Sequence, residues 1–128
     1  MKIQYYLLLF ASLLIVSCSD SIYDDDYVAI DGIYDVELIE EQVFFDALIQ
    51  YVNRNDVEIE ALWDGYDWEV VFADVHHSPT HANITIPNQW IYGDTKIWGS
   101  GYYENGFLRL TYTIEWFGKR WYYTIEGY

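Results

Sequence analysis

Three histidines lie close together in the chain, and histidine is a common ligand of metal ions. Zinc sites combine such residues with acidic or cysteine ligands, and an aspartate precedes His76, His77 and His81. His77 and His81 are four residues apart, a spacing that would place both on one face of a helix. Pro79 between them argues against a helix. We therefore interpret residues 76–82 as an exposed loop, and we expect no metal and no other cofactor.

Paired acids are the second group that could do chemistry. Asp64 with Asp67, or Glu58 with Glu60, could serve a glycosidase or a calcium site. Calcium loops need several oxygen ligands at two-residue spacing around a glycine, and the segment around Gly65 lacks that density. Acids that alternate along a strand usually form its solvated face. We predict no enzyme activity. The alternative is a glycan-active enzyme, and it requires two carboxyl groups in one cleft.

Aromatic side chains are the strongest candidates for binding, because the chain is 20% aromatic, with 14 Tyr and 6 Trp. Trp and Tyr rings stack on sugars and flat apolar ligands, and they also dominate protein interfaces. One cluster surrounds a glycine-containing stretch and comprises Trp90, Tyr92, Trp98, Tyr102 and Tyr103. We predict that it binds an apolar or glycan ligand or a protein partner. The alternatives are that these rings fill the core, or that the chain is an accessory structural subunit of an outer-membrane complex.

The first residues have the layout of a secretory signal. Lys2 precedes an apolar run that ends at Val16, which is shorter than the roughly 20 residues that a membrane-spanning helix needs. Ile15-Val16-Ser17-Cys18 resembles the bacterial lipobox. This resemblance implies cleavage before Cys18, attachment of lipid to it, and an outer-membrane location that is periplasmic or surface-exposed.

The resemblance divides the chain into a signal peptide, residues 1–17, an acidic tether, residues 18–29, and a single domain, residues 30–128. Asp24 to Asp26 in the tether resemble the surface-export signal of Bacteroidota lipoproteins. Cys18 is the only cysteine, so packing must hold the domain together without a disulfide.

The formal net charge is −15. This value argues against nucleic-acid binding, which needs a cationic surface, and against lying flat on anionic lipid. It is compatible with a cationic partner or divalent cations, although we favour self-repulsion that keeps an exposed protein soluble.

Most of the domain alternates between apolar and polar residues, as strands do. The clearest strand is Phe107 to Phe117, and Ile33 to Ile39 and several hairpins from Asp56 onward complete the set. Seven or eight such strands predict an all-β antiparallel meander, closed as a small barrel or folded as a sandwich. Gly99 and Gly101 suggest a bulge or a sharp bend in one of these strands.

Residues 40–52 differ from the rest, because their apolar side chains recur at helical spacing. We predict one short amphipathic helix over this segment. The alternative is two strands with a bend near Asp46.

Two short motifs resemble the lipocalin-like barrels. Gly32-Ile33-Tyr34 is similar to the Gly-x-Trp of their first strand, and Arg120 is similar in position to the arginine of their last strand. The final 45 or so residues also resemble small Bacteroidota lipoproteins, through Ile86-Pro87-Asn88-Gln89, Gly99-Ser100-Gly101 and Leu108 to Thr113. The likeness to lipocalins implies a barrel, and the likeness to lipoproteins carries no activity with it.

Overall fold

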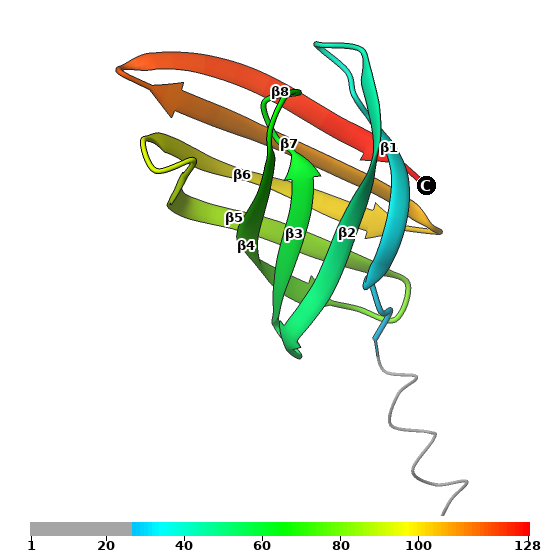
Figure 1. Cartoon of the computed structure of the whole chain (residues 1–128). Coiled ribbons are helices and arrows are strands. Elements are labelled where there is room, and N and C mark those ends of the chain that lie inside the picture. The colour runs from blue at the N-terminus through cyan, green and yellow to red at the C-terminus, as the bar shows by residue number, and fades with distance from the viewer. Residues whose placement is uncertain (1–26) are drawn as a thin grey trace, which may run out of the picture.

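The computed structural model describes residues 27–128, which form one closed antiparallel barrel (Figure 1). Each strand pairs with its neighbours in sequence, and the first also pairs with the last through Val36 and Gly127. The predicted meander is therefore confirmed, and it closes as a barrel. Its strands are β1 (Gly32–Leu38), β2 (Val43–Asn53), β3 (Asp56–Leu62), β4 (Trp68–His77), β5 (His81–Ile91), β6 (Thr95–Glu104), β7 (Phe107–Trp116) and β8 (Lys119–Gly127).

The proposed signal peptide, Cys18 and most of the tether lie outside the described residues. From Tyr27 onward, no helix is long and apolar enough to cross a membrane.

The predicted helix over residues 40–52 is wrong, because residues 40–42 form a turn and strand β2 begins at Val43. Phe45, Ala47 and Ile49 point inward with a period of two, and their neighbours point outward. Phe44 is apolar but lies on the outer face, where it is exposed. An apolar residue on the solvent-exposed face breaks the alternation, and the apolar residues then recur at a spacing that resembles that of a helix. Nor is the segment two strands, since β2 runs unbroken from Val43 to Asn53.

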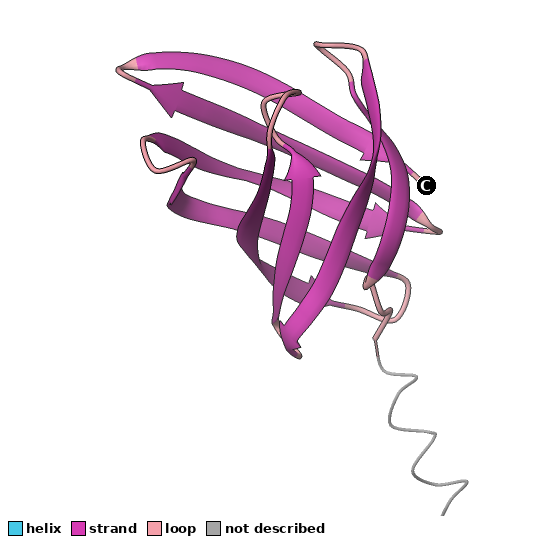
Figure 2. Ribbon diagram, in the orientation of Figure 1, coloured by secondary structure: helices cyan, strands magenta, loops and turns pink. Residues whose placement is uncertain are grey.

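The strands form two sets that run in different directions (Figures 1 and 2). β2, β3 and β4 run steeply across β5 to β8. The sets meet at two seams: β1 pairs with β8 over three residue pairs, and β4 pairs with β5 over only four, Asp74–His77 with Ala82–Thr85. Where the pairing of β4 with β5 ends, the side chain of Gln89 forms hydrogen bonds to the β4 backbone instead. Its side-chain amide accepts from the Phe72 N–H at 2.9 Å and donates to the Phe72 carbonyl at 2.7 Å.

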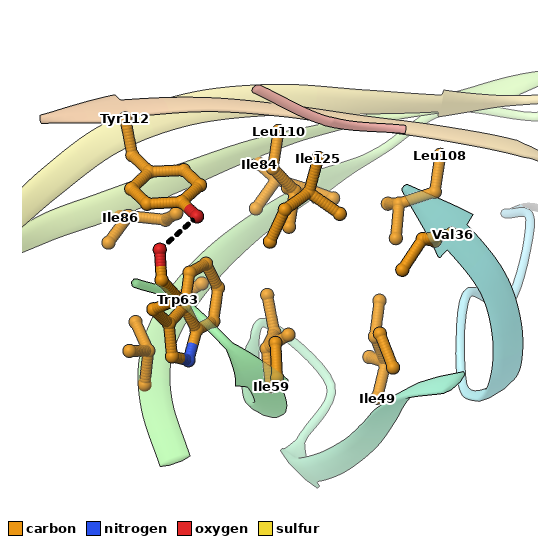
Figure 3. Packing of buried hydrophobic residues seen from close by; sticks show 14 of the residues in the cluster. Val36, Ile49, Ile59, Trp63, Ile84, Ile86, Leu108, Leu110, Tyr112 and Ile125 are labelled. Carbon is orange, nitrogen blue, oxygen red and sulfur yellow. Dashed lines mark hydrogen bonds between the residues drawn. The ribbon is translucent and has the colours of Figure 1, made fainter. Parts of the chain in front are cut away.

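The interior of the barrel is packed with apolar side chains (Figure 3). Every strand contributes its inward face, and Trp63 is the largest of the fully buried residues. Tyr112 lies against it, with ring centroids 5.1 Å apart in an edge-to-face arrangement. Protein interiors gain stability from such dense contact. The centre of this barrel is thus a core and does not form an open ligand cavity.

The irregularity expected near Gly99 lies in the neighbouring strand. β6 keeps an unbroken register with β7 from Lys96 to Glu104, whereas β5 shifts against β6 between Ile86 and Gln89. Gly99 serves a different purpose. A Cβ there would lie 2.2 Å from the Thr111 carbonyl oxygen, so glycine permits the close approach of β6 and β7.

Candidate functional site

The two ends of the barrel differ. In an antiparallel meander alternate turns gather at the same end, so the β1–β2, β3–β4, β5–β6 and β7–β8 turns surround one opening. We call this opening the mouth. The β2–β3, β4–β5 and β6–β7 turns lie at the opposite end.

The opposite end is covered by the first described residues. Ile30 is fully buried there; its carbonyl accepts a 2.6 Å hydrogen bond from the Tyr34 hydroxyl, and its N–H donates to the Tyr51 hydroxyl at 3.0 Å. His77 lies within hydrogen-bond distance of the Val28 carbonyl, at 3.0 Å from Nδ1, and packs against the ring of Tyr27. The N-terminal segment therefore closes this end.

The mouth contains a cavity of about 470 Å³. Ligand pockets commonly measure roughly 300–1,000 Å³. Aromatic and acidic side chains make up most of its lining, which is Glu41, Asp64, Tyr66, Asp67, Tyr92, Asp94, Thr95, Ile114, Trp116, Trp121 and Tyr123. We call this cavity the mouth pocket.

Trp116 and Trp121 form one wall of the mouth pocket. Trp116 continues the inward face of β7 that begins with the buried Leu108 and Leu110, and Trp121 pairs with the buried Ile114. The β7–β8 hairpin projects past β4 (Figure 1). Its last inward-facing residues therefore have no core side chains packed over them. Trp116 is 42% exposed and Trp121 is 39% exposed.

Asp94 fixes the position of Trp116. The Trp116 indole N–H donates to Asp94 Oδ2 at 3.0 Å, and the Thr95 hydroxyl donates to Oδ1 at 2.9 Å. Hydrogen bonds to an ionised carboxylate favour that form, and these two hold the pKa of Asp94 below its usual range. The carboxylate stays charged at the edge of the pocket.

Asp64 organises the opposite wall. Its Oδ1 accepts the backbone N–H groups of Tyr66 and Asp67, both at 2.9 Å, as aspartates do in turns. Tyr92 joins this wall to the β5–β6 turn, since its hydroxyl donates to the Asp67 carbonyl at 2.5 Å. Burial, together with the charge of Asp64, raises the pKa of the Tyr92 hydroxyl, which therefore stays neutral.

Tyr92 is also held in an unusual backbone conformation. Its φ of +53° lies in the left-handed region of backbone conformation, which residues other than glycine seldom adopt. Asn105 and Phe117 adopt the same conformation, and each of the three is followed by a glycine of positive φ in a turn between strands. The conformation of Tyr92 therefore belongs to the β5–β6 turn, and its hydroxyl contact to the Asp67 carbonyl joins that turn to the β3–β4 turn.

The structure separates the aromatic residues that form a cluster in the sequence. Tyr92 lines the mouth pocket, and Tyr103 faces inward against Tyr34, with ring centroids 6.2 Å apart. The other three lie on the outer wall. Lys96 lies over the Trp90 ring at 5.0 Å and Arg120 over the Trp98 ring at 5.4 Å. Tyr102 is partly exposed beside Phe107.

The histidine segment is mostly strand. His76 and His77 end β4 and His81 begins β5, so the loop between them is short. Among residues 27–128, no group of three or more His, Cys, Asp or Glu is placed to hold a metal ion.

The predicted binding cluster omits Trp116 and Trp121. One signal could have identified them. Trp116 shares the period-two face of Leu108, Leu110 and Tyr112, but it lies at the end of the strand, next to the Gly118 turn. A large ring on a core face beside a turn is a candidate for the rim of a barrel.

A second apolar feature lies on the outer wall of β4. Trp68, Val70 and Phe72 alternate along its outward face, and half or more of Trp68 and Phe72 is exposed, at 51% and 55%. Contiguous exposed apolar surface is typical of interaction sites. We call these three residues the β4 strip.

A scan of protein-family models and searches of curated proteins and of solved structures each returned no match.

Proposed function

We propose that this protein is a lipid-anchored, non-enzymatic binding protein of the cell envelope, which holds its ligand in the mouth pocket. The observation that carries the proposal is the difference between the two ends of the barrel. The N-terminal segment packs on the closed end through Val28 and Ile30, and the mouth pocket opens at the other.

This polarity suits a protein held through its N-terminus. Cys18, the proposed lipidation site, lies nine residues before Tyr27, a distance that spans at most about 30 Å of extended chain. A tether of that length would direct the closed end toward the membrane and the mouth toward solution. Two or more acyl chains hold a protein stably at a bilayer, so the pocket would be presented at a fixed surface.

The packed interior also supports the mouth as the binding site. The resemblance to lipocalin-like barrels agrees with the eight antiparallel strands, but here apolar side chains fill the interior, and Trp63 and Tyr112 pack at the mouth end of this core. A ligand of more than a few atoms has no room among these side chains. The aromatic walls of the mouth pocket offer stacking faces instead.

Tryptophan fluorescence tests the proposal. The purified protein is titrated with chitotriose, an apolar dye and choline, and the titrations are repeated with Trp116→Ala. We expect at least one probe to change the emission, and we expect the response to weaken in the variant. An unchanged emission with all three probes, in a folded protein, would contradict binding at the mouth.

Hydrolysis of a glycan is a second candidate, because the mouth pocket brings together Glu41, Asp64, Asp67 and Asp94. Glycosidases use two such carboxyl groups, one of which acts as an acid with a raised pKa. The pKa of Asp94 is instead lowered, and Asp64 is engaged in the turn. Release of reducing sugar from a polysaccharide, abolished by Asp67→Asn, would establish hydrolysis in place of binding.

The β4 strip supports a third candidate, an accessory subunit of a membrane complex. Pull-down from detergent-solubilised membranes tests it. A stoichiometric partner that is lost with Phe72→Ser and retained with Trp116→Ala would favour this candidate over binding at the mouth.

A further inference from the structure

We propose that the ligand of the mouth pocket is an organic cation of the ammonium class. This inference rests on the proposed function and names the chemistry of its ligand. Two observations carry it together: aromatic side chains line a cavity, and the carboxylates beside them lack a basic partner in the lining.

The aromatic faces are the first observation. The face of an aromatic ring carries negative electrostatic potential and attracts a cation within about 6 Å of its centre. Trp116, Trp121, Tyr66, Tyr92 and Tyr123 line the mouth pocket from four different segments of the chain. On the outer wall, Trp90 and Trp98 already pair with Lys96 and Arg120. Among the described residues that line the pocket, none is Lys, Arg or His, so its aromatic faces have no cation of their own.

The charge of the carboxylates is the second observation. Asp64, Asp94 and Glu41 accept hydrogen bonds from backbone N–H, hydroxyl and indole groups, which are all neutral donors. Neutral donors orient a carboxylate but leave its charge in place. A neutral sugar could add hydrogen bonds and would leave that charge unbalanced. A cation would balance it.

The same geometry disfavours a metal ion. Hard divalent cations need several oxygen ligands on one point, and the described residues provide no such group of three. Carboxylates spread around an aromatic-lined cavity of about 470 Å³ suit a larger and weakly hydrated cation. The carboxylates attract the cation through their negative charge, and the aromatic rings make direct contact with it.

Isothermal titration calorimetry with choline and dimethylbutanol tests the inference. Dimethylbutanol is the neutral carbon isostere of choline, so the pair differs only in charge. At matched ionic strength we expect choline to bind about tenfold more tightly. Spermidine and the guanidinium ion form two further arms. Tightest binding of choline or of spermidine identifies a quaternary or a primary ammonium, and tightest binding of guanidinium would overturn the assignment to the ammonium class.

Matched variants locate the site. We expect Trp121→Ala to weaken choline binding by at least about fivefold, and Asp67→Asn to weaken it by about two- to threefold with a smaller salt dependence. Trp90→Ala on the outer wall is the control and should bind as the wild type does. Circular dichroism confirms that each variant is folded.

The outcomes separate the inference from the proposed function. If choline and dimethylbutanol bind equally, or if chitotriose binds and none of the three cations does, the cation inference is overturned and the mouth remains the binding site. If a folded protein binds none of these probes, both proposals fail.

Discussion

The indole N–H of Trp116 donates a 3.0 Å hydrogen bond to the carboxylate of Asp94. This contact joins the end of β7 to the β5–β6 turn, and it fixes one wall of the mouth pocket. It also makes that wall sensitive to acid.

We expect Asp94→Ala to lower the melting temperature at neutral pH. The carboxyl pKa is lowered in the folded protein from the 3.8 of an unperturbed aspartate, so its stabilising contribution is complete above that value. The contribution is lost as the pH falls through the lower, folded-state pKa. The difference in melting temperature between wild type and variant should therefore shrink in strong acid. A difference that persists unchanged at the lowest pH would contradict this role. Asp46→Ala, on the exposed outer face of β2, is the control.

We expect Tyr112→Phe to destabilise the barrel by about 1–3 kcal/mol, because it leaves a buried carbonyl without its donor. The Tyr112 hydroxyl donates to the Trp63 carbonyl at 2.6 Å in the interior (Figure 3). Urea unfolding measures the change, and Tyr102→Phe on the outer wall serves as the comparison. Equal stability of Tyr112→Phe and wild type would show that this bond contributes nothing.

We expect Gly99→Ala to destabilise the protein by about 1–3 kcal/mol, the usual range for overpacking. The added methyl group would lie 2.2 Å from the Thr111 carbonyl oxygen and 2.6 Å from the Tyr112 Cα, and both are backbone atoms that move only with the strand. Ser100→Ala, exposed on the same strand, should have little effect. A melting temperature for Gly99→Ala at or above that of the wild type would contradict the close approach of β6 and β7.

We expect Cys18→Ser to abolish lipid attachment. Cells that express the wild-type protein should incorporate labelled palmitate into it, and the variant should remain unlabelled and leave the membrane fraction. Labelling that continues in the variant would show that the interpretation of Ile15-Val16-Ser17-Cys18 is wrong.

The sequence predicted those strands whose two faces differ in polarity. On β3, Val57, Ile59 and Ala61 alternate with polar residues, and the strand appears where the alternation indicated. On β2, Phe44 and Val52 are exposed apolar residues, and the alternation is lost. The alternation of apolar and polar residues appears only when one face of a strand is buried and the other carries polar side chains. An apolar residue on the solvent side therefore hides the strand pattern.

The site was only partly predictable, because it depends on how far each hairpin projects. Tyr92 could be selected from a local cluster. Trp116 and Trp121 acquire their role only when β7 and β8 outreach the core. The position of Trp116 on a core face beside a turn is visible in the sequence, but the projection of the hairpin depends on strand lengths and turns distributed over the whole chain.

The indole N–H signals of the tryptophans test the mouth pocket most directly. The chain has 6 Trp, and single Trp→Phe substitutions assign each signal in a nitrogen–proton NMR spectrum. The protein is then titrated with choline and, separately, with chitotriose. We predict that the signals of Trp116 and Trp121 shift with at least one probe, whereas those of Trp63 and Trp90 stay in place. Shifts confined to Trp90 and Trp98 on the outer wall, or none at all, would contradict a binding site at the mouth.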